Sequence, residues 1–226
     1  MITSLDDPQL NRCLDSVHNQ TVPFSNVVRV HNVCPADKAF SDALGKTVEE
    51  WVMYLGSDMI LDLDALEKII QFIKRSADDK VIGYFFGLWD TFLDCRIGYV
   101  GVLKASVYKL EKISGNHAGW DGELHRRLKR KGWKASMNFR FLVGTHFDRP
   151  DEYQVFRRFY LHGVRFNHRK PIQEKLAFLL NDTGNHLYQV ALDALNYATV
   201  KNFYPGSHNL EFDRDNYESF SRHSHS

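Results

Sequence analysis

The feature that most constrains the fold is an uninterrupted apolar run, WVMYL, at residues 51–55. The run is short for a helix and lacks the polar alternation of a strand with one solvent-exposed face. Such a run is typical of a strand buried on both faces, as in a parallel sheet covered by helices. It therefore predicts an α/β protein.

The flanking segments extend this pattern into an alternation of strands and helices. We predict strands at residues 1–4, 26–33, 81–86, 99–103 and 133–143, and helices at 9–20, 38–44, 64–74 and 121–131. Asp64 is placed to cap the third of these helices, and Gly132 to end the fourth. The alternation favours a mostly parallel, Rossmann-like central sheet flanked by helices.

The pattern changes after DRPD at residues 148–151. Residues 151–161 and 171–200 are expected to be mostly helical, and the polar end at 219–226 to be frayed. We therefore predict a sheet-containing domain at 1–150 and a mainly helical C-terminal extension at 151–226.

Charge and composition exclude several classes of protein. The 29 Lys and Arg residues nearly balance 28 Asp and Glu, so nothing favours general binding to nucleic acid. The chain lacks an apolar run near the length of a membrane span and a basic, then apolar leader, so membrane spanning and secretion are not expected. Three scattered cysteines suit a reducing, cytoplasmic setting. The basic run at 126–131 leaves peripheral membrane contact open.

Two ordered blocks carry a family resemblance. The first block contains LNRCLDSVHNQT at residues 10–21 and EEWVMYLGSDMIL at 49–61; the second is WDGELHRRLKRKGW at 120–133. Together they resemble the inverting glycosyltransferases of family two. That family has a CLxSVxxQT-like first helix, a strand ending in DxD, and a Glu-Asp pair followed by xxLxxRLxxxG[YW]. The resemblance covers residues 1–148 and implies the GT-A fold.

The resemblance implies an enzyme of polysaccharide biosynthesis that moves a sugar from a nucleoside-diphosphate sugar to a hydroxyl of a glycan or lipid-linked acceptor. Asp58 matches the second Asp of DxD, which would hold Mn²⁺ or Mg²⁺ against the leaving diphosphate. His146 is the candidate for a further metal contact and favours Mn²⁺. Gly56 replaces the first Asp, which leaves weaker nucleotide binding, an unusual donor or loss of metal dependence open.

The same resemblance assigns the remaining site. Asp121 matches the general base, although Trp120 stands where the family has the paired acid. The sugar is expected to contact Trp89 and Trp120. The nucleotide is expected to lie against the ends of the first three strands, at Thr3, Ser4, Asp6, His31, Ser57 and Asp58. His31 replaces an acid of the family, so the nucleobase stays open.

Two other hypotheses remain. A nucleotidyltransferase would carry a glycine-rich basic loop after the first strand, but residues 5–8 read LDDP. A catalytically inert nucleotide- or sugar-binding module is compatible with Gly56, His31 and Trp120, which replace acids of the family. The pattern specifies no oligomeric state.

Overall fold

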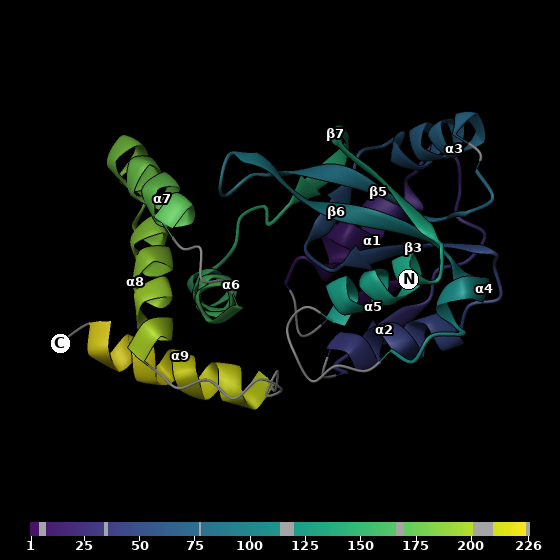
Figure 1. Ribbon diagram of the computed structural model, residues 1–226. Helices are drawn as coiled ribbons and strands as arrows, with labels where there is room; N and C mark the ends of the chain where they lie inside the picture. The colour runs from purple at the N-terminus through teal and green to yellow at the C-terminus, as the bar shows by residue number, and fades with distance from the viewer. Residues whose placement is uncertain are drawn as a thin grey trace. The chain divides into compact units, whose positions relative to one another are not determined.

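The structure is a computed structural model that describes residues 1–4, 8–33, 36–76, 78–113, 120–165, 170–200 and 210–224. The chain divides into two compact units, an N-terminal unit, Met1–Asp148, and a C-terminal unit, Arg149–Ser226 (Figure 1). The first contains a sheet covered by helices, and the second is helical in its described residues.

The N-terminal unit has one sheet with the strand order β2-β1-β3-β6-β5-β7-β4 among the described residues. The strands are β1 (Ile2–Ser4), β2 (Arg29–His31), β3 (Trp51–Gly56), β4 (Met59–Leu61), β5 (Val81–Asp90), β6 (Cys95–Lys104) and β7 (Lys134–His146). The helices are α1 (Leu10–His18), α2 (Ala36–Gly45), α3 (Ala65–Arg75), α4 (Ala105–Tyr108) and α5 (Trp120–Arg130).

This architecture confirms the predicted α/β class, but the sheet is more mixed than expected. Strand β1 pairs in parallel with β2 and β3, as does β5 with β7. The pairs β3–β6, β5–β6 and β4–β7 are antiparallel. The cause is the turn between Asp90 and Cys95, which reverses the chain at once and returns β6 between β5 and β3. The short strand β4 was not predicted.

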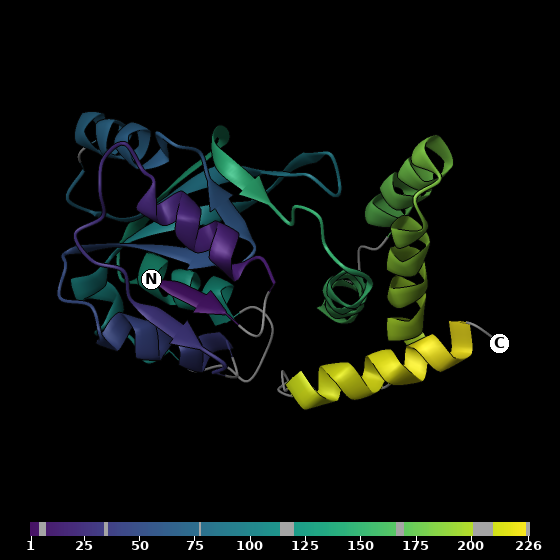
Figure 2. The same cartoon turned by 180° about the vertical axis from the view of Figure 1, so that it is seen from behind.

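The predicted burial is confirmed at Val52, Met53 and Leu55, whereas Trp51 and Tyr54 are partly exposed. Val52 packs on the side of the sheet covered by α2, α4 and α5, whereas Met53 and Leu55 pack on the side covered by α1 and α3. Figure 2 shows α1, in purple, in front of the sheet. Alternate side chains of one strand thus enter two separate apolar layers.

The polar residues of the LNRCLDSVHNQT segment brace the chain that follows β4. The Gln20 side chain donates to the Asp62 carbonyl at 2.8 Å and accepts the Leu66 N–H at 2.9 Å. The Ser16 hydroxyl accepts the Leu61 N–H at 3.1 Å. Asp64 occupies the N-cap position of α3, but the predicted side-chain cap is absent, because its carboxylate pairs with Lys68 at 2.7 Å. Gln20 satisfies a free N–H of that helix end instead.

The C-terminal unit contains α6 (Glu152–Arg165), α7 (Lys170–Thr183), α8 (His186–Val200) and α9 (Leu210–Ser224). Helices α6 and α8 approach closely at Gly163, where a Cβ atom would lie 2.8 Å from the Ala198 methyl. Within the segment expected to be frayed, α9 continues as far as Ser224, and Phe220 is buried with its ring centroid 4.6 Å from that of Phe156. Residues 225–226 lie outside the described residues. No described helix has the length and hydropathy of a membrane span.

The contact between β4 and β7 depends on Gly144, which is paired with Leu61. A Cβ atom at this position would lie 2.2 Å from the Ile60 carbonyl oxygen. We expect Gly144→Ala to lower the free energy of unfolding by about 1–3 kcal/mol, since the backbone must move to relieve the overlap. Urea denaturation measures this loss. The matched control is Gly45→Ala, where a Cβ atom meets nothing within 4 Å; equal stability of the two variants would contradict the close approach.

Candidate functional site

Three polar side chains from separate elements meet at one end of the sheet. Asp58 lies in the turn between β3 and β4, Asp90 ends β5, and His146 ends β7. The register pairs Asp90 with His146 and Met59 with His146, which brings the three together. The His146 Nδ1 atom lies 2.8 Å from Asp90 Oδ2, and its Nε2 atom lies 3.2 Å from Asp58 Oδ2.

The three side chains run from the interior towards solvent. Asp90 is 0% exposed, and the side chains of His146 and Asp58 are 16% and 29% exposed. Asp90 also accepts the Leu93 N–H at 2.6 Å through its other oxygen. A neutral imidazole that donates its Nδ1 proton to Asp90 keeps the Nε2 lone pair on the side of Asp58.

A strained backbone holds Asp58 beside His146. Phe147 has a φ of 56°, a left-handed conformation that costs a bulky residue about 1–3 kcal/mol. Its N–H donates to the Asp58 carbonyl at 3.1 Å, and its ring stacks on the His146 ring with 5.8 Å between the two ring centroids. The next residue, Asp148, forms an ion pair with Arg12 of α1 at 2.6 Å. These contacts offset the strain and fix the end of β7.

The carboxylate of Asp58 and the imidazole of His146 are spaced like two ligands of one divalent cation. No group of three or more His, Cys, Asp or Glu side chains in the described part of the chain is arranged to hold a metal. An octahedral cation with ligands at about 2.1 Å holds neighbouring ligands about 3 Å apart, close to the 3.2 Å between Asp58 Oδ2 and His146 Nε2. Asp90 supplies the carboxylate that usually accepts the second ring N–H of a metal-binding histidine.

The Asp58 carboxylate occupies space that a side chain at position 56 would need. A Cβ atom at position 56 would lie 2.8 Å from Asp58 Oδ1, so the Asp58 carboxylate lies over the place that the family's first Asp would fill. Ser57, between them, is buried. The observed position of Asp58 thus favours a residue without a side chain at 56.

The predicted nucleotide residues lie at neighbouring strand ends. The Ser4 hydroxyl lies 2.8 Å from His31 Nδ1, which joins the ends of β1 and β2. The Thr3 hydroxyl lies 3.1 Å from the Tyr54 hydroxyl of β3. Asp6 lies outside the described residues.

Asp58 and Asp121 both lie close enough to Tyr54 for their charges to affect its pKa. Burial raises the pKa of Tyr54, the hydrogen bond with Thr3 opposes this, and the negative charges of Asp58 and Asp121 raise the pKa further. Asp121 is in the first turn of α5, where its carboxylate accepts the Gly122 N–H at 2.9 Å. It also lines a small cavity of about 60 Å³ together with Tyr54.

Of the two predicted sugar platforms, Trp89 has a described side chain and Trp120 does not. Trp120 begins α5, but its side chain lies outside the described part of the structure. Trp89 pairs with Thr145, one position before the pair Asp90 and His146. Because successive side chains of a strand point to opposite faces, the half-buried Trp89 lies on the other face of the sheet from His146. Sugar contact stays a prediction for both.

Sequence reasoning missed Asp90. The available signal is an acid at the end of an otherwise apolar run, VIGYFFGLWD. A buried charge without a partner is costly, so an acid in such a run indicates a partner from elsewhere in the fold.

Comparison with solved structures identifies the fold. The chain is 14% identical to the mannosyltransferase PcManGT from Pyrobaculum calidifontis, with a TM-score of 0.51 over 91% of this chain and 77% of the other. S. aureus TarS 1–349 is also 14% identical, with a TM-score of 0.52 over 98% and 89%. Both are GT-A glycosyltransferases. The structure therefore has the GT-A fold. Neither a family model nor a curated protein matches the chain by sequence.

His125, one helical turn after Asp121, gives a pH-dependent prediction. Burial lowers its pKa below the usual 6.5, and the charge of Asp121 opposes that shift. The unfolded chain therefore takes up a proton at a higher pH than the folded chain, and stability is lost as the pH falls below about 6.5. We expect His125→Gln to lose less stability than the wild type between pH 7 and pH 5 in urea denaturation. His18→Gln, at an exposed position, is the control and should follow the wild type.

Proposed function

We propose that this protein is a metal-assisted, inverting glycosyltransferase of the family-two type. It moves a sugar from a nucleoside-diphosphate sugar to a hydroxyl of a glycan or lipid-linked acceptor. The observation that carries the proposal is the pair Asp58 and His146, held beside each other at the strand ends of a GT-A fold. The structure of PcManGT, which has the same fold, is a complex with GDP-Man and Mn²⁺.

The donor would lie across the ends of β1, β2 and β3, because open α/β sheets bind ligands outside the carboxyl ends of their strands. Thr3, Ser4 and His31 would line the nucleotide, with Ser57 in the turn after β3. Asp58 and His146 would hold the cation, which when bound neutralises the charge that develops on the leaving diphosphate.

Asp121 would act as the general base on the acceptor side. As the acceptor oxygen bonds to the anomeric carbon, the bond from that carbon to the diphosphate oxygen breaks on the opposite face. The hydroxyl proton passes to the Asp121 carboxylate. The hydrogen bond from the Gly122 N–H orients that carboxylate in the first turn of α5.

The role of Asp121 is testable by Asp121→Asn. Since a positioned base contributes about 10²–10⁴-fold, we expect transfer to fall by that factor, while nucleotide binding is retained. Transfer is measured with a panel of nucleotide-sugars and with glycan and lipid-linked acceptors. Calorimetry with UDP, GDP and dTDP in the presence of Mn²⁺ measures binding.

Glu123→Gln is the matched control, because it removes a carboxylate from the same turn of α5 and leaves Asp121 in place. Full transfer by Asp121→Asn would refute the assigned base. Nucleotide binding without transfer by the wild type would favour the inert binding module.

Asp90 would be a positioning residue, because it reaches the cation only through His146. In Asp90→Asn, the oxygen can keep the bond from the Leu93 N–H, which leaves the amide NH₂ facing His146 Nδ1. The imidazole must then carry its proton on Nε2, and the lone pair for the metal is lost. We expect Mn²⁺ binding, measured by electron paramagnetic resonance, to weaken by about 10–100-fold.

Asp94→Asn is the control for the turn between β5 and β6. Asp94 is exposed, and asparagine tolerates its positive φ of 47°. Unchanged Mn²⁺ affinity in Asp90→Asn, with normal thermal stability, would contradict the positioning role.

A further inference from the structure

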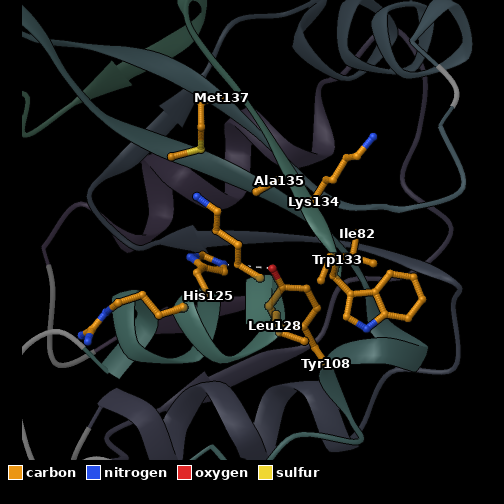
Figure 3. Close-up of a pocket in the computed structure, with 10 residues that line it drawn as sticks. Ile82, Tyr108, His125, Leu128, Trp133, Lys134, Ala135 and Met137 are labelled. Atoms are coloured by element: carbon orange, nitrogen blue, oxygen red, sulfur yellow. Dashed lines mark hydrogen bonds between the residues drawn. The ribbon is translucent and has the colours of Figure 1, made fainter. Parts of the chain in front are cut away.

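A second concave site lies at the opposite end of β7 from His146. A cavity of about 470 Å³ opens between α5 and the first residues of β7, against α4 and the start of β5. Figure 3 shows Met137, His125, Tyr108 and Trp133 around this hollow. Its volume is in the range of pockets that hold small ligands.

The interior of the cavity is mainly apolar. Ile82, Leu128 and Tyr108 are at most 2% exposed, whereas Met137 remains 54% exposed at the cavity. The polar contact is a 2.9 Å hydrogen bond between the Tyr108 hydroxyl and His125 Nε2, drawn as a dashed line in Figure 3. An apolar hollow open to water indicates a ligand that brings apolar surface.

The cavity is also lined by three cations, Arg126, Lys129 and Lys134. No Asp or Glu is found among the described residues that line it. Arg126 and Lys134 pair with Glu123 and Asp78, which do not line the cavity. Among the described residues, Lys129 is the lining cation for which no ion pair is found, so the hollow combines apolar walls with one cation that has no carboxylate partner there.

We propose that this cavity binds a single-chain anionic lipid. Its apolar chain fills the space beside Ile82, Leu128 and Trp133, and its phosphate or carboxylate headgroup pairs with Lys129. A free phosphate would leave the apolar walls uncovered, and a neutral apolar ligand would provide no counter-charge for Lys129. The site shares no residue with the proposed donor and metal positions, and it shares Tyr108 and His125 with the small cavity that Asp121 lines.

Calorimetry on the full chain at low ionic strength tests the ligand class. The probes are dodecyl phosphate below its micelle-forming concentration, and inorganic phosphate and dodecyl maltoside as the two half-ligands. We expect dodecyl phosphate to bind at least about tenfold more tightly than either half-ligand, a difference of about 1.4 kcal/mol. Equal affinity for inorganic phosphate would reduce the site to an anion site and overturn the proposal, as would failure of dodecyl phosphate to bind.

Variants locate the binding. Ala135 is exposed and lines the cavity, so Ala135→Trp fills the hollow and should abolish binding. Lys129→Glu should weaken binding by about tenfold, whereas Arg130→Glu, on the same helix but outside the lining, should bind like the wild type. Unchanged binding by Ala135→Trp, or equal weakening by the two charge reversals, would overturn the proposal. Should Ala135→Trp fail to fold, the two charge reversals still decide.

Discussion

The pairing of β7 with β5 on one side and β4 on the other determines the chemistry available at the sheet edge. The register that aligns Asp90 with His146 also aligns Met59 with His146, so a carboxylate from each neighbour reaches the same imidazole. Gly144 makes the contact with β4 possible, because a side chain there would meet the Ile60 carbonyl. A one-residue slip would move His146 to the other face and separate all three groups.

Helices and turns far from the chemistry maintain that register. Ser16 of α1 and Gln20, two residues after the end of α1, hold residues 61–66 by hydrogen bonds to the backbone. This gives a structural reason for the SVxxQT part of the motif, whose polar side chains brace the strand that follows Asp58. The strained Phe147 fixes the turn from the other side. Both features lie where a shift of a few tenths of an ångström would change the distance between Asp58 and His146.

Sequence reasoning reached the parts of the site that follow local rules. Asp58 was a candidate because it follows a buried strand and matches the second Asp of the family's DxD, and Ser4 and His31 because they match the family's strand ends. Asp90 was not, because its partner is 56 residues away and only the parallel β5–β7 register joins them. The prediction for Trp89 followed its residue type alone, and strand alternation places it on the opposite face from His146. The mixture of parallel and antiparallel strand pairs was missed because the sequence of a tight turn between two apolar strands does not determine which neighbours the second strand has in the sheet.

The sequence by itself determined the α/β class, the buried third strand, the change to helices after residue 148 and the candidates Asp58, His146 and Asp121. The class, the strand and the change to helices follow from periodicity and apolar runs, which are properties of neighbouring residues. The three candidates follow from the resemblance to the family-two glycosyltransferases. The tertiary structure alone decided that Asp90 contacts His146, that Gly56 lies beneath the Asp58 carboxylate, and that Lys129 is among the residues that line an apolar cavity between α5 and β7. Each of these depends on side chains from different elements, whose distances are set by strand register and helix packing and not by position in the chain.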